Sequence, residues 1–285
     1  MSSIARLYRD IRSGEKIEPN RCVLLLSMLA SVAALWAFTT GDIPIYSDKR
    51  HALDMAYDWT RITLDVLEQT RRAGTATLET VQATMATVFL LYHADGFSLK
   101  VRTLHGSAIM LARDLGLHRT DARRNGLPPP KTQADIVDRE LRRRIWWHLA
   151  CTDWSLGTAG SFNGGTYSIS PRQMRVQKPR NITDEELSVM PADFDNPKSV
   201  PTIMSYQIQR LRLGEISRRI ADLDSMMEID ILSFDDIMSV DDEFETALNE
   251  MPVFLRIDQQ SLLESKHLES SHLHLPLQRY IVNIM

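Results

Sequence analysis

The feature that most constrains this sequence is a spacing of apolar residues by three and four positions, which recurs along most of the chain. In the segments 78–92 and 101–115 this spacing places the apolar residues on one face of an α-helix. Sustained alternation of apolar and polar residues is absent from the sequence, and only 167–169 is a candidate for extended structure. The same helical spacing continues over 135–156, 203–223 and 237–251. The sequence therefore predicts an all-α fold, an irregular multi-helix array in a single domain.

Local signals mark where some of these helices begin and end. Ser98 is expected to cap the start of a helix that stops at Gly116, because glycine readily takes the left-handed conformation that ends a helix. Thr183 opens a capping-box pattern and predicts the start of another helix. Two irregular segments separate the helices. The proline-rich segment 121–131 is predicted to be an exposed loop, and the glycine-containing segment 157–181 a long connection.

Composition excludes several classes of protein. The formal net charge of -4 argues against a chain-wide basic nucleic-acid binder. The two cysteines, Cys22 and Cys151, cannot build a disulfide framework or a zinc site made of four thiolates. A reducing intracellular compartment is the natural interpretation. The length of 285 residues allows one large domain or two small ones.

The segment 22–38 has no charged residue and has two interpretations. Its length is close to the lower limit for a membrane span. Acidic residues at Asp10, Glu15 and Glu18 are unusual in the region that precedes the apolar part of a signal peptide. The favoured interpretation is a helix buried on most sides of a bundle, and a membrane tether or the apolar region of a secretion signal is the alternative.

Three consecutive arginines, 142–144, suggest contact with nucleic acid. Consecutive helical residues point about 100° apart, so these side chains cannot follow one phosphate backbone. Ion pairing with acidic neighbours is the favoured interpretation. Asp135 with Arg139, and Glu140 with Arg144, have the four-residue spacing and the order that stabilise a helix.

No segment predicts a catalytic or metal site. His267, His272 and His274 lack a cysteine or carboxylate at a standard zinc spacing. The glycine-rich loop around 160–161 matches neither a nucleophile elbow nor a phosphate-binding loop. His105 lies on an apolar helix face and is expected to be a hydrogen-bonded core residue. The sequence thus predicts no enzyme and no cofactor bound by this chain.

The segment between Arg219 and Arg256 contains many acidic residues and no lysine or arginine. Large apolar residues are interleaved with the acids, as in segments that bind coactivators. The helical spacing favours a second interpretation, in which the acids form the solvated faces of two amphipathic helices and of their connecting loop.

Three ordered pieces of the segment 79–187 carry a resemblance to a known family. The first is an Ala-x3-Ala-Arg-Asp pattern that begins at Ala108 and ends in Leu115, Gly116, Leu117, His118 and Arg119. The second contains Arg143, Arg144, Trp146 and Trp147 and is followed by Asp153. The third is the acidic piece 179–187. Together they resemble the fungal-specific transcription factor domain, the central regulatory region of fungal zinc-cluster transcription factors, and weaker similarity extends over 200–256.

The resemblance implies an all-helical regulatory domain over 1–285, with a motif region at 79–187 and a helical continuation at 199–285. It implies a transcription regulator in the nucleus that is not an enzyme and not a membrane protein. Expected partners are proteins of the transcription machinery or a related regulator, with a small-molecule effector as a further partner. The motif residues are expected to be structural: Gly116 ends a helix, Trp146 and Trp147 bury a large area, and Arg119, Arg143, Arg144 and Asp153 are partly buried, paired charges.

The sequence also departs from the family pattern. The family's six-cysteine cluster, which binds two zinc ions, is not in this sequence, so zinc and direct DNA binding are expected only through a further segment. Residues 163–165 replace the family's Gly-Arg-Pro motif. The sequence stops at 280–285, inside an apparent amphipathic helix, which predicts a domain trimmed at both ends with an unpaired apolar face. Two alternatives remain. In the first, the chain does not bind DNA and is either a stand-alone protein that binds a ligand or partner or a competitor of a full-length regulator. In the second, it is a helical enzyme or carrier on the same scaffold.

Overall fold

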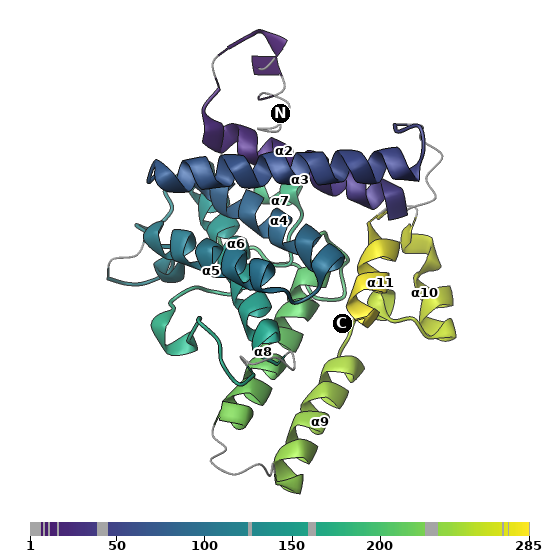
Figure 1. Cartoon of the computed structure of the whole chain (residues 1–285). Coiled ribbons are helices and arrows are strands. Elements are labelled where there is room, and N and C mark those ends of the chain that lie inside the picture. Colours follow the sequence, from purple (N-terminus) through teal and green to yellow (C-terminus); the bar gives the residue numbers. More distant parts are fainter. Residues whose placement is uncertain are drawn as a thin grey trace. The chain divides into compact units, whose positions relative to one another are not determined.

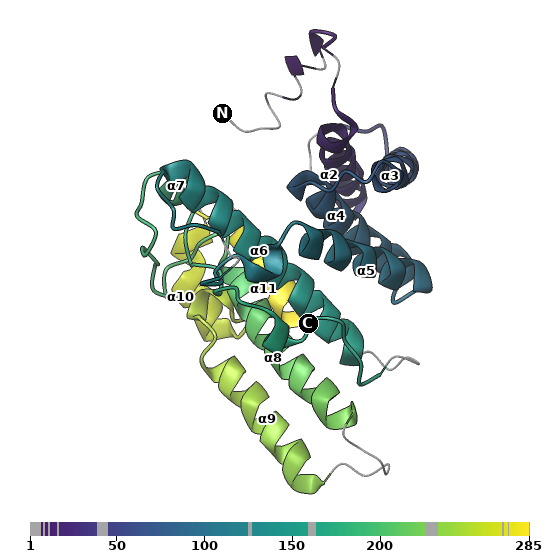
Figure 2. The same cartoon turned by 90° about the vertical axis from the view of Figure 1, so that its left-hand side faces the viewer.

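The computed structural model describes most of the chain and divides it into two compact units, Met1–Gly116 and Leu117–Met285. Each unit is described by itself (Figures 1 and 2). The all-α prediction is confirmed, since the described residues form helices and no strand. The prediction of a single domain stays a prediction. The described residues are 7, 9–10, 12–15, 17–38, 45–124, 127–158, 164–225, 233–269, 271–272 and 274–284.

The described residues of the first unit form four long helices: α2 (Pro19–Phe38), α3 (Lys49–Arg72), α4 (Leu78–Asp95) and α5 (Leu99–Asp114). Helix α2 packs along α3 and α4, and α4 packs on α5 (Figure 1). Ala33 and Ala34 of α2 meet Ala56 of α3, and these small side chains allow the two backbones to approach closely. Ser98 caps α5 by accepting a hydrogen bond from the Val101 backbone N–H, as predicted.

Helix α2 corrects the expectation of a helix buried on most sides. Its Pro19–Ala37 stretch is long and apolar enough to cross a membrane, but only 33% of the apolar 18-residue part of this stretch is buried in the structure. Val23 and Ala33 lie in the core, whereas Val32 and Leu35 are about half exposed. A core helix of a soluble protein and a signal sequence share this length and composition. Burial therefore applies to one face of α2 and not to most of its circumference.

The second unit is organised around the pair α6 (Gln133–Thr158) and α8 (Ser205–Ser225), which lie side by side (Figure 2). Gly214 lets the two helices approach, because a Cβ there would lie 3.1 Å from the Cα of Cys151. The other α-helices are α7 (Asp184–Leu187), α9 (Phe234–Asn249), α10 (Gln259–Glu269) and α11 (Leu275–Ile284). Single 3-10 turns occur at η1 (Leu117–Arg119), η2 (Pro171–Gln173) and η3 (Val253–Leu255).

Three other local features have the predicted structure, and one does not. Gly116 has a φ of 73° directly after the last turn of α5, as expected for a glycine that ends a helix. Thr183 forms the complete predicted capping box with Glu186 at the start of α7. The segment 167–169, a candidate for extended structure, forms no strand. His105 is buried, as predicted.

The C-terminal helix corrects another expectation. Leu275 and Val282 of α11 are buried in a cluster with Phe254 and Leu255 of η3. Arg279 is also buried, and it donates hydrogen bonds to the Phe254 carbonyl oxygen at 3.0 Å and the Ser265 hydroxyl at 2.9 Å. The predicted unpaired apolar face is therefore wrong for the described side chains of α11, because η3 and α10 supply its packing partners.

Candidate functional site

Glu140 of α6 is the centre of a buried network of charges in the second unit. Its side chain is 0% exposed. One carboxylate oxygen, Oε1, accepts hydrogen bonds from Arg144 Nε at 3.3 Å and from the Arg180 backbone N–H at 3.1 Å. The other, Oε2, accepts from Arg180 Nε at 3.2 Å. Glu140 thereby joins α6 to the chain segment that precedes α7.

Asp121 is a second centre of this network. It accepts two hydrogen bonds from Arg143, at 2.9 Å and 2.7 Å, and one from the Gln177 backbone N–H at 2.8 Å. Arg139 Nη1 also donates to it, at 3.2 Å. Burial by itself raises the pKa of the Asp121 carboxyl, but the bonds from Arg143 and Gln177 outweigh burial and hold this pKa below its usual value. The predicted exposed loop therefore begins with a residue whose side chain is only 9% exposed.

The three consecutive arginines all form ion pairs. Arg142 pairs with Asp138 at 2.7 Å, Arg143 with Asp121 at 2.7 Å, and Arg144 with Glu140 at 3.3 Å. The predicted four-residue pair of Glu140 with Arg144 is thus present. The other predicted pair is wrong, because Asp135 caps the start of α6 through the backbone N–H groups of 131 and 132, and Arg139 turns to Asp121 and to loop carbonyl oxygens.

A cavity of about 510 Å³, which we call the network cavity, lies beside these charges. Its polar lining comes from Arg139, Arg143 and Arg180 together with Asp121, and from the exposed Arg123, Gln177 and Asp193. The apolar lining consists of Ala122, Leu127, Pro129, Pro130, Ile136 and Ala192. The cavity therefore combines buried guanidinium groups with apolar walls.

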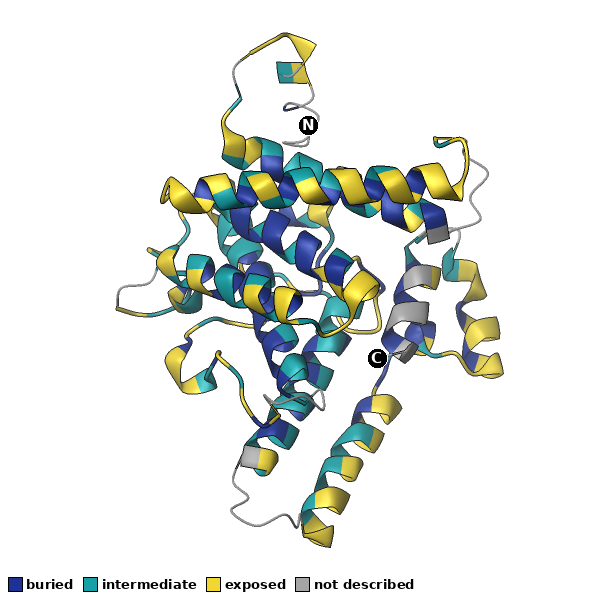
Figure 3. Cartoon of the chain, in the orientation of Figure 1, coloured by how far each residue is buried: buried dark blue, intermediate teal, exposed yellow. Residues whose placement is uncertain are grey.

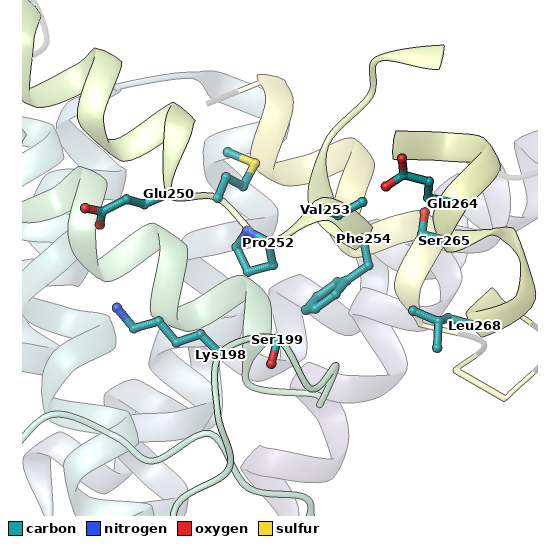
Figure 4. Close-up of a pocket in the computed structure, with 10 residues that line it drawn as sticks. Lys198, Ser199, Glu250, Pro252, Val253, Phe254, Glu264, Ser265 and Leu268 are labelled. Atoms are coloured by element: carbon teal, nitrogen blue, oxygen red, sulfur yellow. The ribbon is translucent and has the colours of Figure 1, made fainter. Parts of the chain in front are cut away.

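A second cavity of about 450 Å³ lies between the region around η3 and α10 (Figure 4). Phe254 and Leu268 form apolar parts of its wall, and Ser265 contributes a hydroxyl group. The charged residues that line it are all exposed: Lys198, Glu250 and Glu264. This cavity lacks the buried charged groups that distinguish the network cavity.

Tryptophans of α6 fix the connection that crosses the helix. Trp147 Nε1 donates to the Gln177 carbonyl oxygen and Trp154 Nε1 to the Ile169 carbonyl oxygen, both at 2.8 Å. Trp146 is 1% exposed, and the ring of His118 lies 5.8 Å from its ring. The tryptophans thus use their apolar area in the core while two indole N–H groups hold loop backbone.

The remaining motif residues range from fully buried to exposed. Asp153 accepts hydrogen bonds from the backbone N–H groups of 168 and 169, at 2.7 Å and 2.6 Å. Leu117 is fully buried and Leu115 is partly buried at the end of α5. Arg119 is exposed, so the expectation of a partly buried charge there is wrong. Its carbonyl oxygen accepts a hydrogen bond within the turn that follows η1. The structural role of the motif set stays a prediction.

Much of helix α9 is exposed, as its colouring by burial in Figure 3 shows, and several of its exposed residues are apolar. Phe234, Ile237 and Leu248 are at least half exposed. Arg219 of α8 holds the helix through an ion pair with Glu243 and a hydrogen bond to the Ser239 hydroxyl. The predicted pair of helices is confirmed, but the connecting segment 226–232, with the acidic Glu228 and Asp230, lies outside the described residues.

Sequence reasoning did not find the partners that complete the network. Asp121, Gln177 and Arg180 lie in segments interpreted as loops, and the bond between Arg180 and Glu140 spans 40 positions of sequence. The described residues contain no group of three metal-ligating side chains. His272 and His274 lie with their rings 5.7 Å apart but belong to no such group. The glycine-rich loop at 160–161 lies outside the described residues.

The known proteins that this chain resembles are fungal transcription factors. Residues 7–250 match the family described as the fungal specific transcription factor domain. The chain is 36% identical over 279 residues to the probable transcription factor lepB of Aspergillus flavus, covering 97% of this chain and 49% of that protein. It is 32% identical over 259 residues to the transcription factor TAS2 of Pyricularia oryzae, covering 88% of this chain and 33% of that protein.

A third relative is the agnestins biosynthesis cluster transcription factor AgnL11 of Paecilomyces divaricatus, with 30% identity over 241 residues, 83% of this chain and 35% of that protein. The chain thus spans about half the length of the first relative and about a third of the other two. No solved structure matches the chain.

Proposed function

The chain belongs to the fungal specific transcription factor domain family, and from this premise we propose that it is the regulatory region of a fungal transcription factor that acts in the nucleus. The observation that carries the proposal is the family match over residues 7–250. Members of this family are transcription factors and not enzymes, which agrees with the predicted non-enzymatic class. One relative is named as the transcription factor of a biosynthesis cluster, and we propose that this chain likewise regulates the genes of such a cluster.

We propose that any contact with DNA and zinc belongs to a separate zinc-cluster segment and not to α6. The side chains of Arg142, Arg143 and Arg144 already bind acidic partners. A phosphate backbone would have to displace those carboxylates, two of which are less than 10% exposed. These ion pairs support a role for this region through proteins and small molecules instead of through direct contact with DNA.

The exposed face of α9 supports a protein partner from the transcription machinery. Phe234 and Ile237 lie in the same turn region as Asp235 and Asp236, and no basic residue occurs from 220 to 255. An apolar groove with a basic rim would complement this mixture of apolar and acidic side chains. A small-molecule effector is the second partner that we propose.

A reporter assay tests the proposal. The chain is fused to a heterologous DNA-binding domain and expressed in a fungal host, and transcription is compared with that given by the DNA-binding domain alone. We expect the fusion to change transcription and to accumulate in the nucleus. The same reporter level with and without the chain, at equal protein abundance, would contradict the proposal.

A matched pair of variants locates the contact. Phe234→Ser is expected to weaken the effect of the fusion on transcription because Phe234 is 73% exposed beside acids. Leu263→Ser changes a 69% exposed residue of α10 and should leave the effect intact. Repression of a full-length relative by the unfused chain would instead favour the competitor alternative.

A further inference from the structure

Three arginines that line the network cavity retain N–H groups without hydrogen-bond partners among the described residues. A guanidinium has five N–H donors. Arg143 uses Nε and Nη2 on Asp121 and Gln177, while its Nη1 lies 3.7 Å from Glu140 Oε2, beyond hydrogen-bond distance. Arg180 uses Nε and Nη1, which leaves both donors of Nη2. Arg139 Nε is buried without a partner.

The charges of the network do not balance within the protein interior. Four guanidiniums, those of Arg139, Arg143, Arg144 and Arg180, have side chains no more than 17% exposed. Only two carboxylates in the network are buried to a similar degree, those of Asp121 and Glu140. A third acidic partner, Asp184, is 67% exposed, and solvent screens its charge. Since buried charges are normally paired, this excess of positive charge favours a bound anion.

The rest of the wall selects the kind of anion. Leu127, Pro129 and Ile136 give the network cavity an apolar side. Its volume of about 510 Å³ lies in the range of about 300–1,000 Å³ that is typical of sites for small molecules. A ligand that fits both parts of the wall has an anionic group and an apolar body.

We propose that the network cavity binds a small organic acid, whose carboxylate accepts hydrogen bonds from Arg143 and Arg180 and whose apolar body contacts Leu127, Pro129 and Ile136. A carboxylate matches the fork geometry of guanidinium donors, and in an organic acid it is attached to the apolar body that the apolar side of the cavity requires. This assignment rests on the proposed role of a small-molecule effector and specifies its chemical class.

Binding is tested on the full chain by isothermal titration calorimetry with benzoate, benzamide and inorganic phosphate. Benzoate should bind with a Kd of about 1 mM, as expected for so small a ligand. Benzamide has nearly the same shape without the charge and should bind at least about tenfold more weakly. Phosphate tests for a site that requires only an anion, and it should also bind more weakly because it has no apolar body.

A charge variant locates the site without removing an arginine from the network. Ala192 is exposed at the edge of the network cavity, so Ala192→Asp adds a competing carboxylate and should weaken benzoate binding about threefold to tenfold. Leu263→Asp adds the same charge on α10 and should not change it.

Three results would overturn the proposal: no saturable binding of benzoate, equal binding of benzoate and benzamide or phosphate, or the same benzoate affinity in the two aspartate variants. None of these results depends on transcription. Failure of the ligand assignment is therefore distinguishable from failure of the reporter assay.

Discussion

Glu140→Gln tests whether the buried network stabilises the second unit. The substitution keeps the size of the side chain and removes its charge. An amide that keeps its oxygen at Oε1 retains the bonds from Arg144 Nε and from the Arg180 backbone N–H. Its NH₂ group then replaces Oε2 and faces Arg180 Nε, so that a hydrogen bond of 3.2 Å becomes a contact between two donors.

The size of the effect follows from that loss. A hydrogen bond to a charged group contributes about 1.5–3 kcal/mol. Removing one partner of a buried pair costs about 3–5 kcal/mol in all, because the remaining charge stays buried. We therefore expect the free energy of unfolding of Glu140→Gln to fall by about 3 kcal/mol, a large part of the 5–15 kcal/mol that is typical of a folded protein.

Urea denaturation followed by tryptophan fluorescence measures this loss. Replacing Trp36 and Trp59 by phenylalanine leaves only the three tryptophans of α6 as reporters of the second unit. Glu215→Gln is the matched control, since Glu215 pairs with Lys178 at a partly exposed site and such pairs contribute at most about 1 kcal/mol. A loss below about 1 kcal/mol for Glu140→Gln would refute the reasoning.

Three further predictions concern acid stability, thiol reactivity and helix packing. The pKa of Asp121 lies below its usual value, so its ionised form should stabilise the fold above about pH 4 and lose this effect as the pH falls further. Asp121→Asn should accordingly destabilise the protein more at pH 7 than at low pH, and an equal loss of stability in denaturation at both pH values would contradict this. Burial raises the pKa of the Cys151 thiol to about 11. A thiol-specific chromophore should therefore label the partly exposed Cys22 in the folded protein and reach Cys151 only after unfolding. Rapid labelling of both cysteines would contradict the burial of Cys151. Gly214→Ala should lower the free energy of unfolding by about 1 kcal/mol. The new methyl group would clash with the backbone of Cys151 at a cost of about 1–3 kcal/mol, and this cost exceeds the gain in helix propensity. Gly106→Ala places its methyl group in open space and should raise the free energy of unfolding by up to about 1 kcal/mol. Thermal or urea unfolding that gives the two variants the same stability would refute the argument.

The parts of the fold that depend on neighbouring residues could be predicted from the sequence. Ser98 and Thr183 cap helices through groups three positions away, and a pattern of that length is visible in one sequence. The all-α class follows from apolar periodicity for the same reason. The spacing of Glu140 and Arg144 also found one contact of the network.

The rest of the candidate site depends on contacts between distant segments. Asp121 reaches Arg143 across 22 positions, and that contact diverts Arg139 from the pair with Asp135 that local spacing predicted. The exposed position of Arg119 and the burial of α11 are likewise decided by which segment packs against them. A periodic pattern gives the face of a helix but not its neighbour.

The arginines that line the network cavity also join separate parts of the chain, so binding of the proposed acid would tie occupancy of the cavity to protein turnover. Arg143 and Arg180 link α6 to segments on both sides of it. An acid that binds only the folded form at ten times its Kd lowers the unfolded fraction about tenfold. Because proteases act on opened chains, the cellular half-life of the regulator would then lengthen as its effector accumulates, and the amount of regulator would itself record the metabolite concentration.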